Sequence, residues 1–588
     1  YINQLSLEAK QVKSHEESDM VHAVNRIVGI IGLLIIPLGS LLFLRSYISL
    51  GDSLKLSVTS TVGALIGMIP EGLYLLMTLA LALGAVRLAK EKVLLNSMKG
   101  IETLSRVDIL CVDKTGTITE PGMEVTEIRP VKDAQDLEAL AQYVEASMDQ
   151  NDTMDAIRKF HKTQVSQPWE ALDIQPFTSK KKYGAIAFES GIYVLGAPEF
   201  VLREGFSELE QEIAPATQAG NRVLAFGKYK GEHLGETLEA PVDLVAWIIL
   251  SNPLRKNAKE TFAYFKQQGV TIKVISGDNP ATVSAIAQKA GIKGAEDLID
   301  ARTLLTEEDL HQAASQYTVF GRVTPEQKKS LVEGLQAKGH KVAMTGDGVN
   351  DILALKTADC SIAMESGNDA TKKMAQVVLL DSDFGKMPSI VAEGRRVVNN
   401  IQRSASLFLI KNIFSILLAI SVTLLAFTYP IMPSQMSLIS GFTIGIPGFF
   451  LALEPNSERI KGRFIETVFK NALPAALTDF ILIFSLVLLS SAFGMRSEEL
   501  SSAAICLMAF VGFTIIYQES QPLNHHKRLV LLGNILAFLV SSSILGRFFN
   551  MSPLRLQTLL ICAIMAVLAL FLIQVFKKLV GWFFHRKK

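Results

Sequence analysis

Long apolar runs alternate with polar stretches along this 588-residue chain. The apolar runs cover approximately residues 27–49, 57–86, 405–428, 435–453, 472–494, 501–517, 528–547 and 556–583. Each run is close to the ~20 residues that an α-helix needs to cross the hydrocarbon core of a bilayer. The pattern therefore predicts about eight membrane-spanning helices, one pair before a long polar insert and the others after it.

The distribution of basic residues predicts on which side of the membrane each loop between these runs lies. Lysine and arginine follow the second run in RLAKEK, precede the third in RRVVNNIQR and end the chain in HRKK. Loops rich in lysine and arginine stay on the cytoplasmic side. The insert between Lys90 and Lys386 is therefore predicted to be cytoplasmic, and the loops RSYISLGD and YPIMPSQ to lie on the opposite side.

The insert has the alternating pattern of strands and helices that is typical of an α/β domain. The segments VDILCVD, TIKVISGD and KVAMTGD are apolar strands that end on an aspartate, and a helix-like segment follows each of them. Alternating strands and helices predict a doubly wound parallel sheet with its site at the carboxyl ends of the strands. The sequence of residues 124–242 differs in pattern from the rest of the insert. We therefore expect these residues to form a second, α+β domain that is inserted into the doubly wound domain.

The chain is thus expected to have five parts. They are a polar linker at 1–22, a first pair of membrane helices at 23–95, a doubly wound domain at 96–123 and 243–385, an inserted domain at 124–242, and six more membrane helices at 386–588.

Composition narrows the class of protein. Hydrophobic residues make up 49% of the chain and the formal net charge is +1, which agrees with a membrane protein and argues against a basic tail that binds nucleic acid. The four cysteines lie far apart in the sequence, so they predict neither a metal site nor a disulfide framework. A reducing cytoplasmic environment is therefore expected for the insert.

Polar side chains at the predicted strand ends provide the groups needed for phosphoryl transfer. Asp113, in CVDKTGTITE, can act as the nucleophile towards a phosphoryl group. Later strand ends supply hydrogen-bond donors, a lysine and Mg²⁺ ligands, namely Ser276, Gly277, Lys328, Asp347, Asn350 and Asp351. Any one of these strings is most often only a turn. Their order, each at the end of a strand, favours a phosphoryl-transfer site.

The strings DKTGTIT, SGDNP, RVTPEQK and TGDGVND resemble the phosphorylation motifs of P-type cation-transporting ATPases, and the resemblance extends over essentially the whole chain. It implies a haloacid dehalogenase-like phosphorylation domain in which ATP phosphorylates Asp113. Mg²⁺ would then be held by Asp113, Asp347 and the carbonyl of Thr115. The catalytic residues that the resemblance implies are Asp113, Lys114, Thr115, Ser276, Gly277, Asp278, Lys328, Asn350 and Asp351.

By the same resemblance, residues 124–242 form the nucleotide-binding domain. The strings PFTSKKKYG, GAPE, GNRVLAFG and SNPLR are similar to the segments with which the family contacts ATP. The implied nucleotide-binding residues are Phe177, Lys182, Gly196, Arg222 and Arg255. The sequence departs from the family pattern at Leu195, where a lysine is usual, and at Asn252, where an aspartate is usual. Without the family, Phe177 is more simply interpreted as a core aromatic.

The second apolar run contains Pro70 and Glu71, and a carboxylate at membrane depth indicates a function. Its IPEG string matches the ion-binding span of the calcium-pump-like branch of the family. Pro70 removes the amide that would bond to the Ile66 carbonyl, and free carbonyls beside a carboxylate can bind a cation. The expected ligands of the transported cation are Ile66, Gly67, Ile69, Glu71, Asn412 and Thr443.

Only part of the calcium-pump ligand set is present. Alignment with that branch places Asn412 on a ligand asparagine, but Ser415 and Ile444 stand where the family has acids. Ca²⁺ takes about six to eight oxygen ligands, so a single remaining acid argues against a two-ion site. One Ca²⁺ is the expected cargo, and the string IGIPGFFLALEPN resembles a bacterial calcium-transporting subgroup. The alternative cargoes are Mg²⁺, Mn²⁺, K⁺ and a polyamine.

Lys411 precedes Asn412 and has two interpretations. Its long side chain can extend to the cytoplasmic interface of the membrane. Alternatively, it is an internal cation that pairs with Glu71 after the transported ion has left.

The family also carries an actuator domain with a TGE string, and TGE does not occur here. The resemblance therefore leads us to expect a fragment of a ten-span pump, without the actuator domain and the first two spans and impaired in dephosphorylation. A membrane-anchored phosphatase of the haloacid dehalogenase type is the alternative of another class, but such enzymes usually have an aspartate where this chain has Thr115. We expect a monomeric, multi-pass protein of a bacterial plasma membrane.

Overall fold

The computed structural model describes residues 18–120, 122–131, 137–161, 167–178, 181–235, 237–425, 427–460 and 462–586. These residues form two compact units, one spanning Ala89–Ile390 and one made of the segments before and after it. We call the first the soluble unit and the second the membrane unit. Most of the linker predicted at 1–22 lies outside the described residues.

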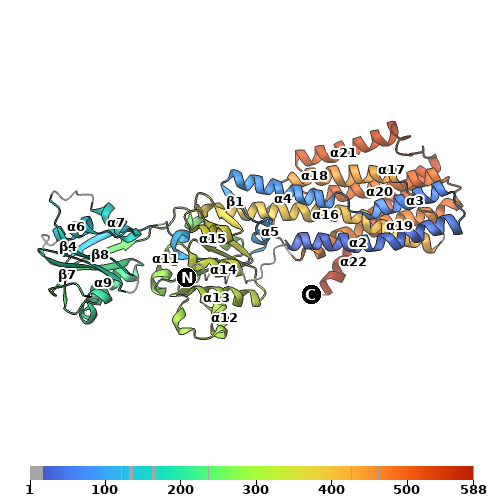
Figure 1. The fold of residues 1–588 in the computed structure, drawn as a ribbon. Helices are drawn as coiled ribbons and strands as arrows, with labels where there is room; N and C mark the ends of the chain where they lie inside the picture. The colour runs from blue at the N-terminus through green and yellow to red at the C-terminus, as the bar shows by residue number, and fades with distance from the viewer. Residues whose placement is uncertain are drawn as a thin grey trace. The chain divides into compact units, whose positions relative to one another are not determined.

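The soluble unit contains a mostly parallel, eight-stranded sheet in the order β1-β14-β13-β12-β2-β9-β11-β10. Its strands are β1 (Val93–Leu95), β2 (Ile109–Val112), β9 (Thr271–Ile275), β10 (Leu298–Asp300), β11 (Val319–Gly321), β12 (Val342–Gly346), β13 (Cys360–Met364) and β14 (Val377–Leu379). Its helices are α5 (Met98–Arg106), α10 (Ala258–Gln267), α11 (Pro280–Lys289), α12 (Glu307–Gln316), α13 (Pro325–Ala337), α14 (Ile352–Thr357) and α15 (Asp369–Met374). The edge strand β1 is labelled in Figure 1.

The doubly wound sheet predicted from the sequence is confirmed. All four residues of β2 are buried, as expected for a central strand of a parallel sheet that is covered on both faces. Among the described strands of this sheet, only β1 runs antiparallel, against β14. Because β1 belongs to this sheet, the predicted boundary at residue 96 is too late.

The soluble unit also contains a six-stranded antiparallel sheet in the order β3-β8-β7-β6-β5-β4. Its elements are β3 (Glu124–Pro130), α6 (Leu137–Ala146), α7 (Asp152–Phe160), β4 (Ala171–Gln175), β5 (Tyr183–Phe188), β6 (Gly191–Gly196), α8 (Pro198–Val201), α9 (Phe206–Gln218), β7 (Arg222–Tyr229) and β8 (Val242–Ser251). Since β8 pairs with both β3 and β7, this sheet continues to Ser251 and the predicted boundary at residue 242 is too early.

The membrane unit is entirely helical among the residues that the structure describes, and eight segments are long and apolar enough to cross a bilayer, as predicted. Its helices are α2 (Asp19–Leu44), α3 (Leu54–Met68), α4 (Leu73–Lys90), α16 (Met387–Leu424), α17 (Pro433–Ile439), α18 (Ile446–Leu453), α19 (Phe464–Ala492), α20 (Ser497–Glu519), α21 (His525–Ile544) and α22 (Leu556–Arg586).

Two of the spans are irregular in their middle. Helix α3 ends at Met68 and α4 begins at Leu73, with Pro70 in the gap. The span made of α17 and α18 contains a π-helical segment at Ser440–Gly445. Irregular backbone at membrane depth is tolerated where it is buried or lines a polar cavity, and π segments are frequent at functional sites. The backbone thus points to the same two regions as the predicted cation ligands.

Candidate functional site

The predicted phosphorylation residues converge at one edge of the eight-stranded sheet. Strand β2 lies between β12 and β9 and is parallel to both. Asp113 follows β2, Ser276 follows β9 and Asp347 follows β12. Since carboxyl ends of neighbouring parallel strands meet at one edge, three loops that are far apart in the sequence share one site.

Asp113 is held on both of its carboxylate oxygens. Its Oδ1 accepts a hydrogen bond of 2.7 Å from the backbone N–H of Lys114, and its Oδ2 accepts one of 3.0 Å from Nζ of Lys328. Burial raises the pKa of Asp113 to about 7, and the charge of Asp351 adds to this, while Lys328 opposes it. The carboxylate is thus fixed in orientation and needs positive charge around it to stay ionised.

Lys328 supplies one such charge from helix α13. The capping box of Thr324 and Gln327 begins this helix, and Lys328 is in its first turn. Lys328 is 3% exposed, and its ammonium also donates a hydrogen bond of 2.6 Å to Asp351 Oδ1. Burial lowers the pKa of Lys328, but Asp113 and Asp351 together outweigh this effect and raise it, so the lysine is charged.

Asp113, Asp347 and Asp351 form a group of carboxylates that suits a divalent cation. One oxygen from each lies within 4.8 Å of the others. Burial and the nearby Asp351 raise the pKa of Asp347 to about 6. Lys328 alone does not balance three carboxylates, and Mg²⁺ prefers such oxygen ligands. The donor set therefore fits Mg²⁺. Asp351, which the strand-end pattern offered for Mg²⁺, lies with Asp113 and Asp347 in this group; the Thr115 carbonyl stays a prediction.

Gly116 brings the loop after Asp113 against Asp347. Its φ is +70°, and a Cβ at this position would lie 1.9 Å from Asp347 Oδ2. Arg255 fixes the loop from the other side, since its guanidinium donates two hydrogen bonds to the Gly116 carbonyl, at 2.6 and 3.2 Å. Arg255 was predicted to bind nucleotide; in this structure it holds the phosphorylation loop.

We expect Gly116→Ala to slow phosphorylation of the protein by ATP at least about ten-fold, because the methyl group would displace the Asp347 carboxylate. Gly122→Ala is the matched control, since Gly122 has a φ of +92° but nothing within 4 Å of its Cβ position. Both variants bear the left-handed strain of about 1–2 kcal/mol. Rates of phosphoenzyme formation measured against Mg²⁺ concentration distinguish them; equal rates in the two variants would contradict the placement of Asp347.

Lys114 and Asp278 form a second ion pair at this edge of the sheet. Lys114 is 3% exposed, and its Nζ also donates a hydrogen bond of 3.3 Å to Asn252 Oδ1. Asn252 is one of the two positions that depart from the family pattern, and it retains an oxygen for Lys114. Ser276 is buried, and its hydroxyl accepts a hydrogen bond from the Asp278 amide.

The remaining predicted catalytic residues lie in the same loops but are less enclosed. Gly277 lies between Ser276 and Asp278, and Asn350 lies beside Asp351; both are exposed. Thr115 is exposed and has an extended backbone. Gly277 and Asn350 are thus accessible to a ligand.

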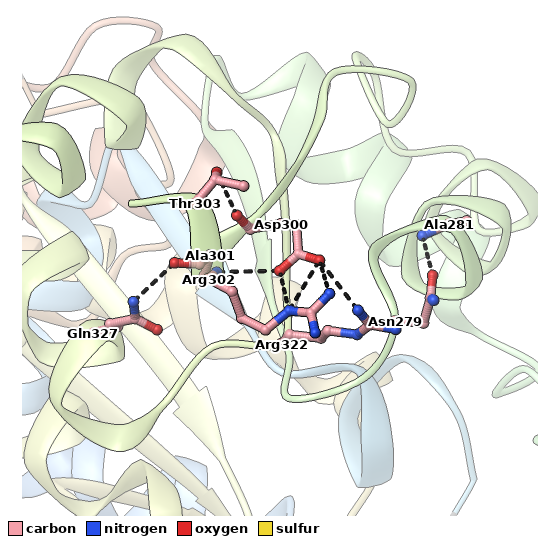
Figure 2. Close-up of polar contacts among 8 residues, drawn as sticks. All are labelled: Asn279, Ala281, Asp300, Ala301, Arg302, Thr303, Arg322 and Gln327. Carbon is pink, nitrogen blue, oxygen red and sulfur yellow. Dashed lines mark hydrogen bonds and ion pairs between the residues drawn. The ribbon is translucent and has the colours of Figure 1, made fainter. Parts of the chain in front are cut away.

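Asp300 lies beside Arg302 and Arg322, and Arg322 connects it to the loop after β9 (Figure 2). Its carboxylate accepts hydrogen bonds from the guanidinium groups of Arg302, at 2.8 Å, and Arg322, at 3.3 Å. The Arg322 backbone has a φ of +53°, and its N–H donates to the Asp278 carbonyl. Sequence reasoning missed this network, because Asp300 belongs to no string that signals chemistry and the string RVTPEQK, which begins at Arg322, was interpreted only through Lys328.

The six-stranded sheet carries a cavity of about 300 Å³. Phe177, Gly196 and Arg222, three of the predicted nucleotide-binding residues, line it together. Phe177 is 36% exposed, which does not agree with a core aromatic. Lys182 is exposed and not among the residues that line the cavity.

Sequence reasoning missed the acidic and polar side of this cavity. Tyr143, Asp149 and Asn151 also line it. Both carboxylate oxygens of Asp149 accept the Phe177 amide, at 3.2 and 3.3 Å, which fixes the aromatic residue beside the acid. Asp149 lies just before helix α7 and belongs to no recognisable motif, so the sequence did not indicate its contact with Phe177.

In the membrane unit, the carbonyl that Pro70 leaves free is already bonded. Lys411 Nζ donates to the Ile66 carbonyl at 3.3 Å and to Ser440 Oγ at 3.0 Å. Lys411 is 2% exposed, so the interpretation in which it extends to the interface is wrong. Its ammonium contacts both irregular spans, at Ile66 in α3 and at Ser440 in the π segment.

The other predicted cation ligands are in different environments. Asn412 is fully buried and its amide has no hydrogen-bond partner among the described residues, whereas the Thr443 hydroxyl donates to the Ile439 carbonyl at 2.7 Å. Glu71 is exposed, and no ion pair within 4.0 Å joins it to Lys411 in the described structure. The two charges nevertheless interact electrostatically over a longer distance.

Gly67 and Ile69 are the last two of the predicted ligands of the transported cation. A Cβ on Gly67 would lie 2.1 Å from Ser415 Oγ, so α3 and α16 are in close contact there. Ile69 is in the gap between α3 and α4, and its side chain is 38% exposed. The structure thus places Gly67 beside the buried Ser415 hydroxyl, whereas Glu71 is exposed.

Comparison with known proteins finds one matching family and several similar transport ATPases. Residues 107–359 match the haloacid dehalogenase-like hydrolase family. The chain is 37% identical to "Probable cation-transporting ATPase exp7" of Streptococcus pneumoniae, over 96% of this chain and 74% of that protein. It is 36% identical to "Calcium-transporting ATPase CtpE" of Mycolicibacterium smegmatis and 38% identical to that of Mycobacterium bovis, in both cases over 90% of this chain and 68% of the relative.

Proposed function

Since the chain belongs to the P-type cation-transporting ATPases and is an ATP-driven, multi-pass membrane transporter, we propose that it works through an aspartyl phosphate on Asp113 and moves Ca²⁺. The observation that carries the first part is the position of Asp113 between Lys328 and two further carboxylates at one sheet edge. The relatives named above come from bacteria, which supports a bacterial plasma membrane as its location.

In the proposed reaction, a carboxylate oxygen of Asp113 attacks the γ-phosphorus of ATP. The bond between that phosphorus and the bridging oxygen breaks, ADP leaves with the electron pair, and an acyl phosphate remains on Asp113. Lys328 stabilises the charge that spreads over the phosphoryl oxygens, and the Lys114–Asp278 pair keeps the neighbouring loop in place. A Mg²⁺ held by Asp347 and Asp113 would neutralise phosphate charge.

The adenine base is proposed to bind against Phe177 in the cavity of the six-stranded sheet. Base stacking on an aromatic side chain contributes about 1–3 kcal/mol. We therefore expect Phe177→Ala to raise the ATP concentration for half-maximal phosphorylation about 5- to 150-fold without changing the maximal level. Phe200→Ala is the control, because Phe200 is 42% exposed and does not line the cavity. An equal shift in both variants would contradict the proposed binding mode.

Ca²⁺ is the proposed cargo for two reasons. Two of the similar proteins are named calcium-transporting ATPases. In addition, the region of the Pro70 break offers backbone carbonyls, the Asn412 amide and the carboxylate of Glu71, which are oxygen ligands of the kind that Ca²⁺ takes. The nearby ammonium of Lys411 disfavours a second bound cation, which supports a single-ion site.

The choice of ion is tested by phosphorylation of the purified protein in lipid vesicles with radiolabelled ATP. Ca²⁺, Mn²⁺, K⁺ and a polyamine are titrated separately at fixed Mg²⁺, and Mg²⁺ is varied in a further series. We expect Ca²⁺ to stimulate phosphoenzyme formation at the lowest concentration. Stimulation by another cation with no effect of Ca²⁺ would refute the choice of cargo, although not the role of Asp113.

A further inference from the structure

Hydroxyl side chains follow one face of α3 between the Pro70 break and the outer side of the membrane. Ser57, Ser60 and Thr61 are 0%, 6% and 9% exposed, whereas Val62, the next residue, is 39% exposed. Positions three or four apart share one face of a helix. The hydroxyls therefore lie on the face of α3 that packs inside the bundle, where an apolar face would be expected.

A small cavity lies beside these hydroxyls. Its volume is about 10 Å³, and the polar residues that line it are Arg45, Ser46, Ser60, Thr61, Thr423 and Thr428, with Tyr429 beside them. Thr61 Oγ1 is buried and has no hydrogen-bond partner among the described residues. A polar cavity of about 10–15 Å³ has room for one water molecule. The spare hydroxyl thus indicates that the cavity accommodates a polar occupant.

The outer end of this polar region is a carboxylate. Asp52 Oδ2 accepts hydrogen bonds from Ser46 Oγ, at 2.8 Å, and from Thr428 Oγ1, at 2.9 Å. Ser46 Oγ also lies 3.1 Å from Ser57 Oγ, so the Ser57 hydroxyl can donate to it. Asp52 lies in the loop RSYISLGD, on the side opposite to the basic loops, and is partly exposed. Three separate segments thus gather oxygens around one outer acid.

The inner end reaches the proposed cation site. Tyr429 lines the cavity, and its buried hydroxyl, near that of Ser415, makes no hydrogen bond among the described residues. Ser415 in turn contacts Gly67, just before the break in the span. Buried hydroxyls without a hydrogen-bond partner among the described residues, those of Ser415, Tyr429 and Thr61, thus occur between Gly67 and the outer acid Asp52.

We propose that these hydroxyls mark the route by which the transported cation leaves to the outer side, with Asp52 as its last ligand. Hydroxyl and carboxylate oxygens bind hard cations. Arg45, whose Nε is buried without a hydrogen-bond partner, lines the same cavity and repels a cation that stays there. The cavity is thus a place of transit and release. The inference rests on the proposed cation transport but concerns residues that the phosphorylation chemistry does not use.

The test asks which positions water and ions reach from outside. Thr61→Cys is made in a protein whose Cys506 and Cys562 are replaced by alanine. Intact cells or right-side-out vesicles are exposed to two membrane-impermeant methanethiosulfonate reagents, one bearing trimethylammonium and one bearing sulfonate. Val62→Cys is the matched control, because it is adjacent in sequence but on the exposed face of the helix. Thr423→Cys repeats the test from α16 if the first variant does not fold.

We expect Thr61→Cys to react from outside at least about ten-fold faster than Val62→Cys, and faster with the cationic reagent. Adding Asp52→Asn should remove most of that preference for the cation. Equal rates at the two positions, or a charge preference that Asp52→Asn leaves unchanged, would overturn the proposal. The labelling needs no ATP, so its failure would leave the proposed phosphorylation of Asp113 intact.

Discussion

Asp113→Asn is expected to abolish the phosphoenzyme that the protein forms from ATP. Asparagine keeps the size and shape of the side chain but cannot form a stable acyl phosphate, so the label should fall from near-stoichiometric to background, a loss of at least about 100-fold. The measurement is acid-quenched incorporation of radiolabelled phosphate, with hydroxylamine treatment to show that the bond is an acyl phosphate.

The control for this variant is another aspartate of the same unit. Asp381 is exposed and pairs with Lys92, and among the described residues it makes no ion pair with a residue of the site. Asp381→Asn should be phosphorylated like the unaltered protein. Retention of hydroxylamine-sensitive label in Asp113→Asn would show that another carboxylate is the acceptor, and the proposed chemistry would fail.

Lys411→Met is expected to lower the cation concentration for half-maximal phosphorylation by at least about ten-fold. In the structure the ammonium bonds to the Ile66 carbonyl, so it occupies a ligand that the cation needs. Two unit charges 4 Å apart repel each other by about 4 kcal/mol at an effective dielectric constant of 20, and a divalent cation feels twice that. Methionine retains the buried stem and removes the charge.

Lys411→Arg separates the effect of charge from that of packing. It keeps the positive charge and should remain near the unaltered protein in its cation dependence, although its planar head fits the site less well. If Lys411 replaces the ion during the cycle, Lys411→Met should also change the charge moved per ion. An unchanged cation dependence and an unchanged ratio of charge to ion would show that Lys411 only supports the fold.

The sequence was sufficient to predict the sheet edge that carries Asp113. Several apolar strands that each end on an aspartate are compatible with few folds. Strands of a parallel sheet must be buried, and their carboxyl ends must meet at one edge. The eight spans were predictable for a similar reason, since the length of an apolar helix is set by the membrane. The break at Pro70 followed from the missing amide of proline.

The partners of long side chains were harder to predict. The sequence did not indicate that the Arg255 guanidinium bonds to the Gly116 carbonyl, because a flexible side chain takes an acceptor that only the packed structure brings near; its contact with nucleotide stays a prediction. Lys411 illustrates the same difficulty. Its position near the start of an apolar run was compatible with a head group in water, but packing of α16 against α3 buries it. Such contacts depend on how helices pack, which no local pattern encodes.

The boundary errors have a topological cause. Strands β1 and β8 each pair with partners far away in the sequence, β14 and β3 respectively. A local change in composition does not reveal to which sheet a strand belongs, so the edges at residues 96 and 242 were misplaced. Asp52 escaped notice because a loop aspartate is common, and only the folded structure gathers Ser46 and Thr428 around it.

The central claim is that a cation at the Pro70 break controls phosphorylation of Asp113, and the Ca²⁺ dependence of phosphoenzyme formation in Glu71→Gln tests it most directly. The claim predicts that half-maximal phosphorylation will require at least about ten-fold more Ca²⁺ in Glu71→Gln than in the unaltered protein, with the same level at saturation. If the two proteins respond to Ca²⁺ at the same concentration, the cation does not bind at Glu71 and the claim is contradicted.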